Sequence, residues 1–148
     1  MKKLIIIPLL ISSTFLISKG VSAGPFTEQL SRCLVTSTSV DDRNDLVRWM
    51  FSAAAKHPAV KDLVNVTPEI LENSNKKMGE LMTRLLTVSC LKETKEALKY
   101  EGNATIEASF NALGQVAGKE MFSHPQVAEG MSNLEKYIDT ETINKLIK

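Results

Sequence analysis

The stretch RWMFSAAAKHPAV, residues 48–60, is the segment on which the predicted fold depends. It contains the only tryptophan, Trp49, and one of the two histidines, His57, within the densest apolar run outside the N-terminus. A shorter echo, KEMFSHPQV, occupies residues 119–127. Because a residue that precedes proline is disfavoured in the α region, both segments predict a helix that stops at a His-Pro pair.

The helix that leads into this stretch is predicted over residues 40–56. Ser39, followed three residues later by Asp42, resembles a capping box with Asp in place of Glu. Apolar side chains then cover nearly the whole circumference: Leu46, Val47, Trp49, Met50, Phe51, Ala53 and Ala54. A helix that is apolar all round is typical of a buried one, so this segment is predicted to be the structural hub.

The rest of the chain also predicts helices. Four prolines (25, 58, 68 and 125) stand where helices can begin, and neither a sustained strand alternation nor an Asn-Gly or Asp-Gly hairpin signal is found. The predicted fold is all-α, a single compact orthogonal or bundle-like domain of about six helices. Its helices are predicted at 26–35, 40–56, 58–64, 68–91, 103–123 and 125–138, with an exposed continuation over 92–100 before Gly102 and a frayed terminal helix to 148.

The cleanest helical period lies in the second half of the predicted 68–91 helix, which the Asn73-Ser74-Asn75 run is expected to weaken earlier on. Its stripe comprises Met78, Leu81, Met82, Leu85, Val88 and Ser89. Cys90 falls one residue round from this stripe. The later helix has a face of its own, formed by Ile106, Phe110, Leu113, Ala117 and Met121.

Residues 1–23 have the pattern of a cleaved signal peptide. A positive start at Lys2 and Lys3 precedes an apolar segment that is too short and interrupted for a convincing membrane span, and Val21-Ser22-Ala23 supplies the small-x-small cleavage pattern. Cleavage is predicted after Ala23, which leaves a single domain over 24–148. Without a further long apolar run, we expect no stable membrane insertion of the mature chain, and the periplasm or secretion is the expected location.

The charge of the predicted mature chain argues against polyanionic partners. The full sequence has 18 basic and 17 acidic residues, and removal of Lys2, Lys3 and Lys19 leaves 15 against 17. The remaining basic residues are dispersed, whereas nucleic acids and anionic membranes select clustered positive charge. We therefore expect no nucleic-acid partner.

The two cysteines, Cys33 and Cys90, predict one disulfide in an exported protein. Each is followed by leucine and, further along, by a Met-Phe-Ser and His-Pro segment. This order suggests two pseudo-repeated helical units, although the second needs a ten-residue insertion. Two interpretations stay open: an ancient duplication, or a coincidence between the common start and stop signals of helices.

The candidate site residues are Trp49, His57 and His124. The two histidines could be paired metal ligands or acid–base groups, but a zinc site normally needs three or four ligands and no metal-binding spacing is present. The preferred interpretation places each imidazole structurally at a helix C-terminus. Trp49 is a helix-packing anchor or, if exposed, a binding hot spot. No nucleophile motif, phosphate loop or haem motif occurs, so neither catalytic residues, nor a metal, nor a cofactor is predicted.

These observations predict an exported, non-catalytic helical protein that acts by binding another protein, for instance as an inhibitor or immunity factor. The first alternative is a carrier of a small apolar ligand, with a cavity between segments 40–56, 68–91 and 103–123 lined by Met and Phe. The second is a metal-dependent enzyme that uses His57 and His124. The sequence names neither the partner nor the oligomeric state.

Overall fold

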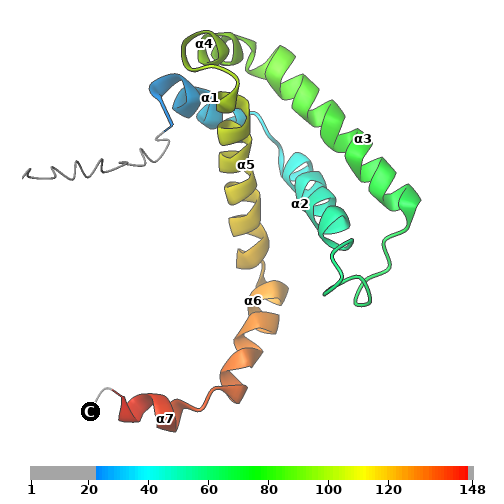
Figure 1. The fold of residues 1–148 in the computed structure, drawn as a ribbon, viewed down its shortest axis with the longest axis vertical. Coiled ribbons are helices and arrows are strands. Elements are labelled where there is room, and N and C mark those ends of the chain that lie inside the picture. Colours follow the sequence, from blue (N-terminus) through cyan, green and yellow to red (C-terminus); the bar gives the residue numbers. More distant parts are fainter. Residues whose placement is uncertain (1–22, 147–148) are drawn as a thin grey trace, which may run out of the picture.

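A computed structural model describes residues 23–146, and this part of the chain contains seven α-helices and no strand (Figure 1). The predicted all-α class is confirmed. The predicted signal peptide, apart from Ala23, lies outside the described residues, as do residues 147–148. The elements are α1 (Pro25–Thr36), α2 (Val40–Ala54), α3 (Pro68–Arg84), the π-helical turn η1 (Leu85–Ser89), α4 (Leu91–Glu101), α5 (Ala104–Ser123), α6 (Pro125–Ser132), the 3₁₀ turn η2 (Asn133–Tyr137) and α7 (Thr140–Lys145).

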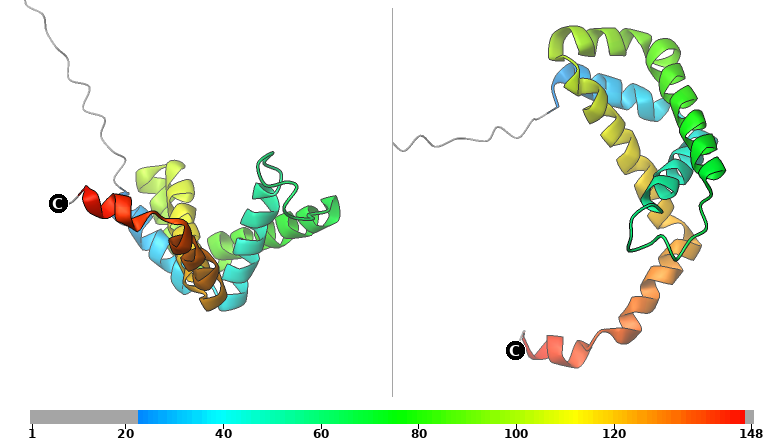
Figure 2. Two further views of the ribbon diagram at one scale, coloured as in Figure 1. Left: turned by 90° about the horizontal axis from the view of Figure 1, so that it is seen from below. Right: turned by 45° about the vertical axis from the view of Figure 1, so that its right-hand side comes forward.

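Helix α5 runs through the centre of the body and packs against α1, α2 and α4, while α2 lies along α3 (Figures 1 and 2). The buried cluster draws apolar side chains from all five of these helices and from η1. Its members are Leu30, Leu34, Leu46, Met78, Leu81, Leu85, Cys90, Ala97, Leu113 and Ala117. The chain therefore forms one core at the crossing of α1, α5 and the α3–α4 corner.

The predicted disulfide is confirmed between Cys33 and Cys90, whose Cα atoms are 5.9 Å apart. The two cysteines occupy different local settings. Cys33 lies inside α1, whereas Cys90 lies in the break between η1 and α4. The bridge thus ties α1 to the corner where the chain turns from α3 into α4.

The corner at Cys90 differs from the continuous helix predicted over 68–91. The Cys90 N–H donates to the carbonyl of Leu85, five residues back, in place of the usual four. A π turn takes up one extra residue, and this rotates fully buried Cys90 onto the core side. Val88, predicted on the buried stripe, is consequently 72% exposed. Helix α3 continues through residues 73–75, the stretch predicted to weaken it.

Helix α2 corrects the prediction of a fully buried hub. The predicted capping box is confirmed, since Ser39 and Asp42 exchange side-chain and backbone hydrogen bonds. Only Leu46 and Ser52 are buried on this helix, however, and Phe51 is 55% exposed. The apolar circumference exceeds what the partners can cover, because α2 packs only against α3 and α5.

Two further expectations change in the connections. The helix predicted over 58–64 is replaced by a series of turns, and the helix predicted over 125–138 divides into α6 and η2. Helices α6 and α7 extend away from the body, and neither they nor η2 contributes a buried residue (Figures 1 and 2). Within residues 23–146, no helix has the length and apolar character needed to cross a bilayer.

Candidate functional site

An apolar hollow lies between the end of α2, the loop over residues 55–67 and the start of α3. We call it the α2–α3 groove. Its volume is about 500 Å³. The groove is lined by Arg48, Phe51, Ser52, Ala54, Ala55, Val60, Leu63, Val64, Val66, Ile70 and Ser74.

The loop that closes the groove is built from tight turns. The His57 carbonyl accepts the N–H groups of Val60 and Lys61, and the His57 imidazole Nδ1 accepts the N–H of Ala59 at 3.2 Å. The hydroxyl of Thr67 then caps α3 by accepting the Ile70 N–H, also at 3.2 Å. These turns keep the loop beside the two helix ends, so its valines and Leu63 border the groove.

Four large apolar side chains stand exposed around this groove. The exposed fraction is 77% for Leu63, 55% for Phe51, 50% for Val64 and 46% for Ile70. Single exposed apolar residues are ordinary on protein surfaces, whereas a contiguous patch around a hollow is typical of an interaction site. The groove is therefore the strongest binding candidate among the described residues.

Trp49 joins α2 to α3 beside the groove and is not one of the residues that line it. Its indole Nε1 donates to Asn75 Oδ1 on α3 at 2.9 Å, and its side chain is half-buried against the core. Phe51, two residues on, lies about 200° further round the helix axis and lines the groove. The sequence predicts Trp49 as a helix-packing anchor or, if exposed, as a binding hot spot, and the structure places it against α3 and the core. Phe51 is missed because the sequence pattern assigns the whole Met-Phe segment to the core.

Charged pairs join the first half of α2 to the second half of α3. Arg84 reaches Asp42 at 2.8 Å, and Lys77 reaches Asp45 at 3.2 Å. Burial by itself raises the pKa of Asp42, but hydrogen bonds from Ser39 and Arg84 outweigh it and hold the pKa below its ordinary value. Both carboxylates are paired with basic side chains of α3, so these contacts hold the two helices together.

The two histidines lie in separate places. His57 belongs to the loop beside the groove, and His124 joins α5 to α6. The His124 N–H donates to the Met121 carbonyl, and its own carbonyl accepts the N–H groups that begin α6. His124 lines a hollow between α2 and the α5–α6 junction that His57 does not reach, and no group of three or more metal-binding side chains occurs among the described residues.

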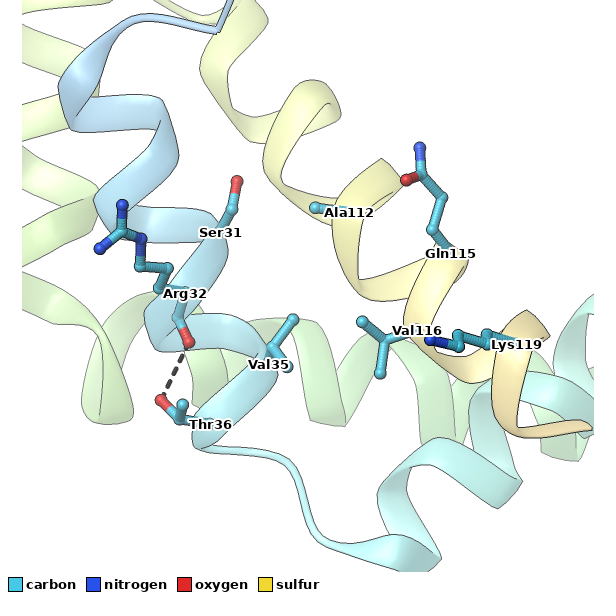
Figure 3. A pocket seen from close by; sticks show the side chains of 8 residues that line it. All are labelled: Ser31, Arg32, Val35, Thr36, Ala112, Gln115, Val116 and Lys119. Atoms are coloured by element: carbon cyan, nitrogen blue, oxygen red, sulfur yellow. Dashed lines mark hydrogen bonds between the residues drawn. The ribbon is translucent and has the colours of Figure 1, made fainter. Parts of the chain in front are cut away.

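A second hollow lies between α1 and α5, where Val35 and Val116 approach each other from the two helices (Figure 3). Small and polar side chains form the rest of its lining, with Arg32 and Lys119 at the edge. No aromatic side chain lines it, and none of its lining residues is a large apolar side chain left mostly exposed. It offers a weaker anchor than the α2–α3 groove.

Comparison of the chain with protein-family models, with curated proteins and with solved structures finds no match. The function must therefore be argued from the site alone.

Proposed function

We propose that this protein is an exported, non-catalytic binding protein whose α2–α3 groove receives an apolar segment of a partner protein. One observation carries the proposal: Phe51, Leu63, Val64 and Ile70 stand exposed around a single hollow. Burial of one such side chain contributes about 1.5–3 kcal/mol, so a partner that covers several of them gains enough to offset part of the entropy lost on association.

The shape of the groove favours a partner segment with its apolar side chains on one face. The walls are two helix ends and a turn-rich loop, an arrangement that an amphipathic helix can fill with side chains spaced three and four residues apart. Arg48 lies at the rim, where it also pairs with Asp45 at 3.1 Å. Location outside the cytoplasm is supported by the leader pattern and by the Cys33–Cys90 bridge, since disulfides persist in oxidising compartments.

The test is affinity capture from the native compartment with matched variants of the mature chain. Leu63→Asp places a charge in the groove, and Val88→Asp makes the same change at a 72% exposed apolar position on η1, which does not line the groove. Both sites are exposed, so both variants are expected to fold. A protein captured by the wild type and by Val88→Asp but lost with Leu63→Asp supports the proposal. The same set of proteins captured by all three contradicts it.

A second candidate function, carriage of a small apolar ligand, is favoured by the volume of the groove, which lies within the usual range for small-molecule pockets. The groove differs from the predicted carrier cavity, because α5 does not border it and no methionine lines it. Native mass spectrometry of the freshly purified protein separates the two functions. A co-purifying small molecule that Leu63→Asp removes supports the carrier, and the bare polypeptide mass counts against it.

A further inference from the structure

The first turn of α1 is capped by a side chain from a distant part of the chain. The carboxylate of Glu101, the last residue of α4, accepts the backbone N–H groups of Phe26 at 2.9 Å and Thr27 at 2.8 Å. It also accepts the Thr27 hydroxyl at 2.5 Å. The first N–H groups of a helix have no partner within it, and the residue before Pro25 is Gly24, which has no side chain to cap them.

Gly24 itself lies against this carboxylate. A Cβ atom added at Gly24 would come within 2.7 Å of Glu101 Oε2, and closer still to the other carboxylate atoms. The backbone nitrogen of a residue lies about 2.5 Å from its Cβ position, so the Gly24 nitrogen lies within about 5 Å of Oε2. Opposite charges at that separation interact strongly enough to shift a pKa.

Among the described residues that line this position, Glu101 has the only ionisable side chain. Ala23, Gly24 and Glu101 share a hollow whose other lining residues are Thr27, Ala104, Thr105 and Ala108. Glu28, in the first turn of α1, is paired with Arg32. On α4, Lys99 lies over the ring of Tyr100, which stacks on Phe26.

We propose that hydrolysis of the Ala23–Gly24 peptide bond creates a binding partner for Glu101, the α-ammonium group of the mature N-terminus. The reaction consumes one water molecule under a signal peptidase. It leaves a carboxylate on Ala23, which departs with the leader, and an ammonium group on Gly24. The inference rests on the export part of the proposed function and is independent of the groove.

The ion pair completes a clamp between the mature N-terminus and the end of α4. A positive charge at a helix N-terminus opposes the helix dipole, and the Glu101 carboxylate compensates it there. The pKa of Glu101 is held below its ordinary value, first by the Thr27 hydroxyl and then by the two N–H groups against the opposing effect of burial. The carboxylate is therefore charged across the pH range in which the amine titrates.

The site also explains the residue at position 24. A Cβ atom at this position would overlap the Glu101 carboxylate, so a larger side chain requires the carboxylate to shift, whereas glycine leaves it beside the new terminus. A leader cut one residue earlier would place the ammonium group on Ala23, about 3.8 Å of chain further out.

The first measurement is N-terminal sequencing of the exported protein, with Gly24 expected; any other terminus overturns the inference. The second is an NMR pH titration of the chain over 24–148. The pKa of the Gly24 amine is expected above the ordinary range of about 7.7–8.0 and within that range in Glu101→Gln. Glu96→Gln, on the same helix and without an ion pair in the described residues, is expected to keep the raised value.

A third measurement does not depend on variants that could disturb folding. The chain with a free Gly24 amine is expected to unfold about 2 °C or more above the same chain acetylated at Gly24 at pH 7. The difference should vanish at pH 10, where the amine is neutral. An amine pKa that Glu101→Gln leaves unchanged, or equal unfolding temperatures at pH 7, overturns the inference. Loss of the captured partner with Leu63→Asp moves neither result, so the two proposals fail separately.

Discussion

Removal of the Cys33–Cys90 bridge is expected to lower stability more than any surface change in this protein. The bonded cysteines are 57 residues apart in sequence. The chain-entropy model gives a loop of this length about 4 kcal/mol, because the bridge restricts the unfolded chain. Domains of this size are commonly stable by only about 5–15 kcal/mol, so the bridge supplies a large share.

The perturbation is the double change Cys33→Ala with Cys90→Ala. Alanine is chosen because a serine at fully buried position 90 would place a hydroxyl in the core. The expected loss of about 4 kcal/mol corresponds to a fall in Tm of roughly 12–20 °C for a chain of this length.

The assay is thermal and urea unfolding followed by circular dichroism. The urea m-value should rise as well, because the unfolded chain without the bridge exposes more surface. Reduction of the wild-type protein should reproduce the loss. A fall in stability below about 1 kcal/mol, or an unchanged m-value with no response to reductant, would refute the account of the bridge as a constraint on the unfolded chain.

Three further predictions concern contacts between helices and their caps. Trp49→Phe should cost about 1 kcal/mol through loss of the 2.9 Å hydrogen bond to Asn75, and a double-mutant cycle with Asn75→Ala should show coupling; additive losses would argue against that bond. Ser39→Ala should cost about 0.5–2 kcal/mol in urea unfolding by removing the cap of α2, and no measurable loss would mean that the box is not formed in solution. The folded protein holds the pKa of Asp42 and of Glu101 below their ordinary values, so the unfolded chain binds protons more tightly at these two groups. The stability that they contribute is therefore present above about pH 4.5 and is lost as the pH falls further. Tm should therefore decline in acid, with a shallower decline in Glu101→Gln; parallel profiles would contradict this assignment.

Several helix starts and ends could be predicted from sequence because each signal acts over a few residues. Ser39 and Asp42 predict the start of α2, and Thr67 predicts the start of α3. Gly102 ends α4 with a positive φ of 79°, a conformation that a residue without a Cβ adopts easily. Pro58 gives the same signal and begins no helix. The helix predicted over 58–64 would have only about two turns, and so short a helix without a packing partner is not stable.

The corner at Cys90 required information that the helical period does not contain. The sequence places Cys90 one residue off the buried stripe, and the π turn absorbs that residue while the bond to Cys33 holds the corner. A regular period predicts a regular helix, and a regular helix places Val88 on the buried face. The one-residue mismatch was the available signal.

The groove could not be predicted because burial depends on how many partners a helix has. An apolar circumference around α2 predicts burial only if neighbours surround the helix, and here α3 and α5 leave the Phe51 side uncovered. The sequence pattern predicts a short helix for Leu63 and Val64, not the rim of a hollow. Their spacing gave no sign that the loop folds back beside α2.

Site-specific photo-crosslinking in the native compartment tests the central claim most directly. A photoreactive amino acid replaces Leu63 in the groove in one strain and Val88 on η1 in another, since both side chains are more than 70% exposed. The account predicts a discrete crosslinked protein from position 63 and none from position 88. Crosslinks of equal yield at both positions, or none at position 63, would contradict a binding function for the α2–α3 groove.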